Sequence, residues 1–122
     1  MAKSVMIVDD SASLRQVVSI ALKGAGYDVV EACDGKDALT KLDGRKLHLI
    51  ISDVNMPNMD GISFVKAAKL LPAYKFTPVI MLTTEAGENK KHEGQAAGAK
   101  AWVVKPFQPA QMLTAVSKLV LP

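Results

Sequence analysis

The sequence predicts an α/β domain built on a five-stranded, doubly wound parallel sheet with five helices. Two observations predict this class: apolar runs of strand length recur along the chain, and segments with helical spacing of apolar residues alternate with them. Such alternation builds a parallel sheet with helices on both faces. The chain has 122 residues, 49% of them hydrophobic and 22% charged, which suits one globular domain over residues 1–122.

The five predicted strands are short runs rich in Val, Ile and Leu. They cover Val5 to Val8, Tyr27 to Ala32, Leu47 to Ile51, Val79 to Leu82 and Ala101 to Val104. The first, third and fourth runs are almost continuously apolar, as expected for strands that are buried on both faces. The second run is interrupted by Asp28 and Glu31, which suits a strand at the edge of the sheet.

The five predicted helices follow these strands in turn. The first has apolar residues at i, i+3, i+4, i+7 and i+8 from Leu14 to Leu22, and Gly24 ends it. The others are marked by Ala38 to Leu42, Ile62 to Leu71, Gly87 to Ala97 and Met112 to Val120. The fourth has the weakest pattern, because Gly94 inside it costs about 1 kcal/mol relative to alanine.

Charge and cysteine content narrow the classes of function. The net charge is +3, yet the fifteen basic residues are scattered along the chain and no aromatic residues accompany them, so we expect no binding to nucleic acid. No apolar run approaches the roughly 18–20 residues of a membrane span, and the first residues lack a secretory signal, so we expect no membrane insertion. Cys33 is the only cysteine, which favours a cytoplasmic location.

Polar residues stand at the ends of four predicted strands, where sheets of this class bind their ligands. They are Asp9 and Asp10 after the first strand, Asp53 after the third, Thr83 after the fourth and Lys105 after the fifth. Two carboxylates ~4 Å apart repel by about 4 kcal/mol at an effective dielectric constant of 20. Because Lys105 offsets only part of this negative charge, we expect the cluster to bind a cation. Hard oxygen ligands without nearby His or Cys favour Mg²⁺ as that cation.

Four stretches of this sequence resemble the motifs of response-regulator receiver domains. They are MIVDDS, LIISDVNMPNMDG, VIMLTT and AWVVKPF, in the order and at the spacing of that family, over essentially the whole chain. The DVNMPNMDG stretch is most similar to single-domain chemotaxis receivers that act on the flagellar motor. The resemblance implies a phosphorylation-operated switch of a two-component system, with the flavodoxin-like strand order 2-1-3-4-5.

The resemblance also implies roles for the residues at the strand ends. Asp53 is expected to be the phosphoacceptor, which attacks the phosphoryl group of a kinase phosphohistidine. Asp10, Asp53 and the main-chain carbonyl of Asn55 are expected to bind Mg²⁺, with Asp9 in support. Lys105 is expected to hold charge on the phosphoryl oxygens in the transition state.

Two further residues are expected to carry the signal away from the site. The resemblance implies that the Thr83 hydroxyl bonds a phosphoryl oxygen and that an aromatic residue three positions before Lys105 turns inward in response. The family usually has Tyr or Phe there, whereas this chain has Trp102. Indole is bulkier and donates one hydrogen bond, so a plain core role on the fifth strand is the alternative for Trp102.

The implied partners are a histidine kinase, a downstream protein such as the flagellar motor switch, and a phosphatase. We expect a monomeric signalling protein without an effector domain, which catalyses only its own phosphoryl transfer and slow autodephosphorylation. A receiver of another phosphorelay is an alternative. A Mg²⁺-dependent phosphohydrolase with an aspartyl nucleophile is another, although Asn55 stands where such enzymes carry a second acid. A flavin carrier of the same fold is disfavoured, because Asp9 and Asp10 would repel the flavin phosphate.

Overall fold

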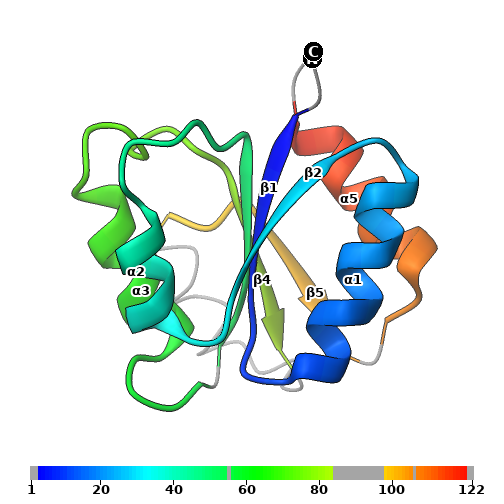
Figure 1. The fold of residues 1–122 in the computed structure, drawn as a ribbon, viewed down its shortest axis with the longest axis horizontal. Helices are drawn as coiled ribbons and strands as arrows, with labels where there is room; N and C mark the ends of the chain where they lie inside the picture. The colour runs from blue at the N-terminus through cyan, green and yellow to red at the C-terminus, as the bar shows by residue number, and fades with distance from the viewer. Residues whose placement is uncertain (1–2, 55, 84–97, 106, 121–122) are drawn as a thin grey trace.

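Five parallel strands form one sheet in the spatial order β2-β1-β3-β4-β5, as the resemblance implied (Figure 1). The computed structural model describes residues 3–54, 56–83, 98–105 and 107–120. Its strands are β1 (Ser4–Val8), β2 (Asp28–Ala32), β3 (Leu49–Asp53), β4 (Val79–Thr83) and β5 (Ala101–Val104). Its helices are α1 (Ala12–Gly24), α2 (Gly35–Lys41), α3 (Gly61–Lys69) and α5 (Pro109–Leu119).

The described residues form four helices where the sequence predicts five. The four correspond to the first, second, third and last predicted helices, and the predicted fourth, Gly87 to Ala97, lies outside the described residues. Helix α2 begins at Gly35, before its first apolar marker, because the Asp34 carboxylate caps it by accepting from the Asp37 N–H. Within the described ranges, no helix has the length and apolar character needed to cross a membrane.

The strands alternate their side chains between two apolar cores. On β1, Val5 and Ile7 pack with residues of α1 and α5, while Met6 and Val8 pack with residues of α2 and α3. Figure 1 shows these two helix pairs on opposite sides of the sheet. All four side chains are fully buried, which confirms that this continuous apolar run is covered on both faces. Burial of such a side chain contributes about 1.5–3 kcal/mol.

Strands β2 and β5 form the two outer strands of the sheet. Asp28 and Glu31 are exposed on β2, which confirms the edge position expected from its interrupted apolar run. Because all five strands are parallel, they begin at one end of the sheet, the amino edge, and finish at the other, the carboxyl edge. The amino edge lies at the top of Figure 1 and the carboxyl edge at the bottom.

His48 links β1 to the segment that precedes β3 at the amino edge. Its Nδ1 accepts a hydrogen bond from the Ser4 N–H at 3.0 Å, and its own backbone N–H donates to the Ser4 carbonyl at 2.8 Å. Burial, and then the nearby ammonium groups of Lys3 and Lys46, lower the pKa of His48. Only the neutral imidazole has a lone pair on Nδ1, so protonation removes the bond from Ser4.

Protonation of His48 is therefore expected to destabilise the fold. Because the pKa is lower in the folded chain than in the unfolded chain, the unfolded chain takes up the proton first as the pH falls. The free energy of unfolding should then decrease as the pH drops below about 6.5. Urea unfolding between about pH 7.5 and 5.5 measures this decrease. In His48→Asn, the Asn amide oxygen can accept from the Ser4 N–H and does not titrate, so the free energy of unfolding should decrease less over this pH range. If the variant and the wild type show the same pH dependence, this role of His48 is wrong.

Candidate functional site

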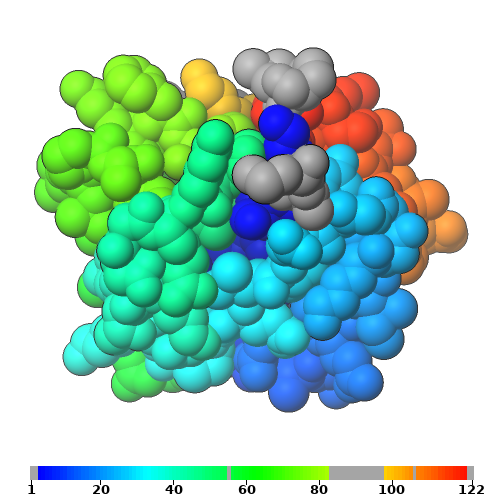
Figure 2. Space-filling view, turned by 45° about the horizontal axis from the view of Figure 1, so that its top comes forward, coloured from blue at the N-terminus to red at the C-terminus, as the bar shows by residue number. Residues whose placement is uncertain are grey.

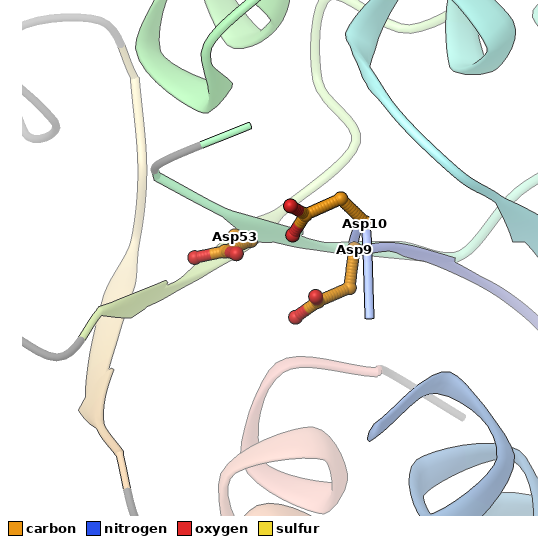
Figure 3. A group of neighbouring side chains, drawn as sticks. All are labelled: Asp9, Asp10 and Asp53. Carbon is orange, nitrogen blue, oxygen red and sulfur yellow. The ribbon is translucent and has the colours of Figure 1, made fainter. Parts of the chain in front are cut away.

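Three aspartates meet at the carboxyl edge, at the ends of the neighbouring strands β1 and β3 (Figure 3). Asp9 and Asp10 follow β1, and Asp53 is the last residue of β3. The pairing of Val8 with Ser52 sets these two strand ends side by side. One carboxylate oxygen from each aspartate lies within 4.8 Å of the other two. Asp9 and Asp53 are buried, whereas Asp10 is exposed.

Lys105 places a positive charge next to these carboxylates. Its Nζ lies 3.0 Å from Asp9 Oδ2 and 3.3 Å from Asp53 Oδ2. Burial lowers the pKa of the Lys105 ammonium, but Asp9 and Asp53 together raise it by more, so the net shift is upward. One ammonium group against three carboxylates leaves the cluster with an excess of negative charge.

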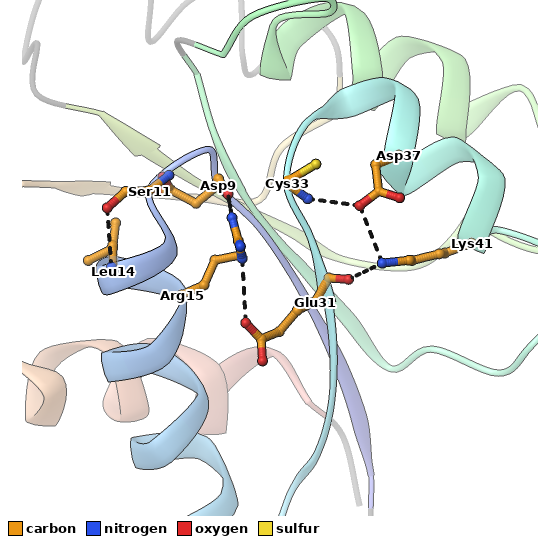
Figure 4. Close-up of polar contacts among 8 residues, drawn as sticks. All are labelled: Asp9, Ser11, Leu14, Arg15, Glu31, Cys33, Asp37 and Lys41. Atoms are coloured by element: carbon orange, nitrogen blue, oxygen red, sulfur yellow. Dashed lines mark hydrogen bonds and ion pairs between the residues drawn. The ribbon is translucent and has the colours of Figure 1, made fainter.

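Hydrogen bonds hold Asp9 in place from several sides. Its Oδ1 accepts from the Ser11 N–H at 2.9 Å, and its Oδ2 accepts from Lys105. Its backbone carbonyl accepts from the Arg15 guanidinium at 2.6 Å, and Arg15 also pairs with Glu31 of β2 at 3.4 Å (Figure 4). The protein thus engages both carboxylate oxygens of Asp9, while the exposed Asp10 is the carboxylate more open to an ion from solvent.

The donor set fits a hard divalent cation. It consists of carboxylate oxygens from Asp9, Asp10 and Asp53, with no His or Cys in this cluster of described residues. Mg²⁺ prefers such oxygen ligands and usually keeps several waters. A divalent cation would also reduce the repulsion that Lys105 offsets only in part. Asn55, whose carbonyl is expected to complete the ligand set, lies outside the described residues.

Gly61 allows helix α3 to pack directly against the backbone of Asp53. A Cβ atom on Gly61 would lie 1.9 Å from the Asp53 carbonyl oxygen. The Gly61 N–H donates to the Val54 carbonyl at 2.8 Å, and the Asp60 carboxylate caps α3 by accepting from the Ser63 N–H. Helix α3 thus begins at Gly61, next to Ile62, the first apolar marker of the third predicted helix. The contact with Asp53 was not predicted, because an Asp-Gly pair also fits an ordinary helix start.

Asn58 and Asp34 join the loop after β3 to the start of α2. The Asn58 side-chain N–H donates to Asp34 Oδ2 at 2.7 Å, and Asp34 Oδ1 accepts from the Asp37 N–H at 2.7 Å. The bond from Asp37 and then that from Asn58 lower the pKa of Asp34. Asn58 has a φ of 68°, a left-handed conformation that Asn adopts more readily than most residues. The sequence analysis did not predict the bond between Asn58 and Asp34. The only local signal for it was that Asp34 stands where the N-cap of a helix is expected, three residues before Asp37.

Thr83 and Trp102 lie on the next two strands of the sheet, β4 and β5, and Thr83 directly follows Leu82, the residue that pairs with Asp53. Thr83 ends β4 and pairs with Val104, but its side chain lies outside the described part of the chain. Trp102 is half-buried, pairs with Met81, and packs against the core on the side of α2 and α3. Among the described residues, its buried indole Nε1–H has no hydrogen-bond partner. The structure therefore brings together Asp9, Asp10, Asp53 and Lys105, while Trp102 belongs to a core layer.

Comparison with known proteins identifies relatives along nearly the whole chain. Residues 5–117 match the family described as response regulator receiver domain. The chain is 38% identical to protein PilG of Pseudomonas aeruginosa over 112 residues, which cover 92% of this chain and 83% of that protein. It is also 38% identical to chemotaxis protein CheY1 of Helicobacter pylori over 118 residues, which cover 95% of this chain and 94% of that protein.

Solved structures resemble the fold over the same length. Chemotaxis protein CheY4 of Vibrio cholerae is 50% identical, with a TM-score of 0.94 over 98% of this chain and 99% of that chain. The receiver domain of the sensor histidine kinase PA1611 from Pseudomonas aeruginosa has a magnesium ion coordinated in its active-site cleft. It is 22% identical, with a TM-score of 0.90 over 98% of both chains, so its likeness concerns the fold.

The contact of Gly61 with Asp53 predicts that one added methyl group disturbs the site. In Gly61→Ala, α3 and the end of β3 must move apart, which should lower the free energy of unfolding by about 1–3 kcal/mol. Gly24→Ala is the matched control, because a Cβ on Gly24 meets no atom within 4 Å. That variant should be as stable as the wild type or up to about 1 kcal/mol more stable. Urea unfolding measures the free energy of unfolding of the wild type and the two variants. If Gly61→Ala is as stable as the wild type, this contact does not constrain the packing of α3 on β3.

Proposed function

Because the chain belongs to the family of response regulator receiver domains and so serves two-component signalling, we propose that its Asp53 accepts a phosphoryl group from a histidine kinase. The observation that carries the proposal is the cluster of Asp9, Asp10 and Asp53 with Lys105 at the carboxyl edge. Open α/β sheets bind their ligands at this edge. A carboxylate nucleophile, oxygen ligands for a metal and a fixed cation are the groups that phosphoryl transfer needs.

In the proposed reaction an oxygen of Asp53 attacks the phosphorus atom of a phosphohistidine, the P–N bond breaks, and the imidazole leaves. Lys105, whose ammonium lies between Asp9 and Asp53, would bind a phosphoryl oxygen. Asp10, Asp53 and the Asn55 carbonyl would hold Mg²⁺, with Asp9 in support. When bound there, Mg²⁺ would neutralise part of the charge on the phosphoryl oxygens.

The output of this reaction is a change in partner binding. Phosphorylation adds about −1.5 to −2 charges. The Thr83 hydroxyl would bond a phosphoryl oxygen, and Trp102 would repack in response. Couplings of this kind are typically ~1–3 kcal/mol, which is enough to change the affinity for a partner about 5- to 150-fold. Beyond its own phosphorylation and slow autodephosphorylation, the protein would catalyse no reaction.

The relatives suggest the signalling route. CheY1 and CheY4 are chemotaxis proteins by name, and this chain is 38% and 50% identical to them. The proposed output is therefore chemotactic, with a histidine kinase as donor and a component of the flagellar motor switch as the downstream target. A phosphatase would end the signal. The protein would work in the cytoplasm as a monomer.

Phosphorylation of Asp53 can be tested by intact mass spectrometry. Wild-type protein incubated with acetyl phosphate and Mg²⁺ should gain one phosphoryl group, and Asp53→Asn should gain none. Asp60→Asn is the matched control, because it changes an acid on the same loop and Asn caps helices as well as Asp does. The Asp60 variant should label like the wild type, and Asp10→Asn should need more Mg²⁺. Full labelling of Asp53→Asn would refute the proposed phosphoacceptor.

The proposed switch can be tested by amide hydrogen exchange and by the fluorescence of Trp102, the only tryptophan in the chain. Beryllium fluoride, a phosphoryl mimic, should change exchange over residues 98–105 and the emission of Trp102. Thr83→Ala should reduce both changes and still allow Asp53 to be phosphorylated. Thr114→Ala, on the exposed side of α5, is the control and should respond like the wild type. Identical exchange with and without the mimic would mean that the output surface lies elsewhere.

A further inference from the structure

Eight of the fifteen basic residues, which are scattered along the sequence, lie at the amino edge of the fold. This edge is formed by residues 3–4, 23–28, 42–48, 69–78, 98–100 and 118–120, which precede the strands or end the helices. In these described segments the bases are Lys3, Lys23, Arg45, Lys46, Lys69, Lys75, Lys100 and Lys118, and the acids are Asp28 and Asp43. The amino edge is therefore strongly basic, although the whole chain has a net charge of only +3.

The turn between α3 and β4 adds exposed apolar side chains to this edge. Leu70 is 83% exposed and Phe76 is 87% exposed, more than any other large hydrophobic residue that the structure describes. The Lys75 Nζ lies 5.6 Å from the centroid of the Phe76 ring. Residues 61–84 contain three lysines and no acid, so nothing within this segment neutralises the lysines.

The turn is ordered, so these side chains project from a fixed support. Tyr74 is buried, and its hydroxyl donates to the carbonyl of Arg45 at 2.8 Å and accepts from the N–H of Gly44 at 3.0 Å. The Lys69 ammonium donates to the Thr77 carbonyl, which closes the turn from the other side. The two exposed apolar side chains thus stand outward next to an anchored aromatic residue.

Helix ends explain only part of the basic charge. Lysines are favoured in the last turn of a helix, where they face the negative end of its dipole, as Lys23 and Lys118 do. Lys3, Lys75 and Lys100 belong to no helix of the described residues. The helix dipole also gives no reason for exposed Leu and Phe side chains between lysines.

The shape of the turn favours a flat partner. Leu70 and Phe76 project from the turn, and they line neither the hollow between β5 and α5, which Lys100 and Lys118 help to form, nor the hollow at the loop before α3. A groove that binds a peptide or small molecule is concave. A projecting apolar tip surrounded by lysines instead fits a lipid surface, where apolar side chains enter the headgroup region and ammonium groups meet anionic headgroups.

We propose that the amino edge docks, through Leu70, Phe76 and the surrounding lysines, on a membrane rich in anionic lipid. Figure 2 turns this edge toward the viewer, and the yellow-green α3–β4 segment forms a rounded projection at its upper left. Docking in this way leaves the carboxyl edge, with Asp53, directed away from the membrane. Each lysine near an anionic surface raises binding about five-fold, so the attachment is reversible and weakens with added salt.

Vesicle sedimentation tests the proposal. The protein should sediment with phosphatidylcholine vesicles that contain about 40 mol% phosphatidylglycerol and remain in solution with phosphatidylcholine alone. Leu70→Ser combined with Phe76→Ser should weaken binding about ten-fold or more. Lys75→Gln combined with Lys100→Gln should weaken it about 25-fold.

Matched controls separate the amino edge from general stickiness. Val17→Ser combined with Ile20→Ser removes exposed apolar side chains from α1, and Lys36→Gln removes an exposed lysine near the carboxyl edge; both should bind like the wild type. Equal sedimentation with both kinds of vesicle, or with none, would overturn the proposal. A third outcome would also overturn it: the Leu70→Ser and Phe76→Ser double variant binds the anionic vesicles as well as the wild type does, and the wild type binds soluble polyglutamate equally tightly. That outcome would indicate an acidic protein as the partner.

Discussion

The contact of Lys105 with Asp9 and Asp53 ties the end of β5 to the ends of β1 and β3. Asp9 is 0% and Asp53 6% exposed, so without this ammonium group two buried carboxylates would lose the cation that they share. Removal of one partner from a buried ion pair typically costs about 3–5 kcal/mol. The same contact prepares the site for chemistry, because a lysine already shared by two carboxylates cannot also neutralise Asp10. The remaining negative charge attracts a cation from solvent, and a phosphoryl group on Asp53 would compete for Lys105. Stability of the carboxyl edge and its proposed chemistry therefore depend on one ammonium group.

The helices position the same site from the outside. Helix α3 approaches so closely that only glycine fits at position 61, beside the Asp53 carbonyl. The loop that leads into α3 is held by the bond from Asn58 to Asp34, whose carboxylate also caps α2. The Asp53 backbone is thus held by a glycine contact on one side and by strand pairing with Leu82 on the other. A rigid backbone at this position keeps the carboxylate in one place while charge is added to it.

Local sequence patterns predicted the strands and the aspartate cluster, because a strand end is marked by residues that are neighbours in the chain. Asp9, Asp10, Asp53 and Lys105 could be expected at one edge once the strands were taken as parallel. The end of β3 was predicted at Ile51 and lies at Asp53, because pairing with β4 keeps Ser52 and Asp53 in the sheet despite their polarity. The contacts of Gly61 with Asp53 and of Asn58 with Asp34 could not be predicted, since they join residues through packing. The basic amino edge could not be predicted from the sequence either, because its residues are spread along the chain from Lys3 to Lys118.

The two edges of the sheet differ in charge partly because parallel strands make all the described helices run in the same direction. Each described helix begins toward the carboxyl edge and ends toward the amino edge, so side-chain caps such as Ser11 and Asp60 gather at one end and lysines at the other. Each edge carries more charge than helix ends require: the aspartate cluster at one, and Lys3, Lys75 and Lys100 at the other. A five-residue strand separates them by roughly 17 Å, about twice the ~8 Å Debye length at physiological ionic strength. A phosphoryl charge that is exposed to solvent at the carboxyl edge would therefore be largely screened from the exposed lysines of the amino edge. Attachment through one edge and signalling through the other can then operate without opposing each other.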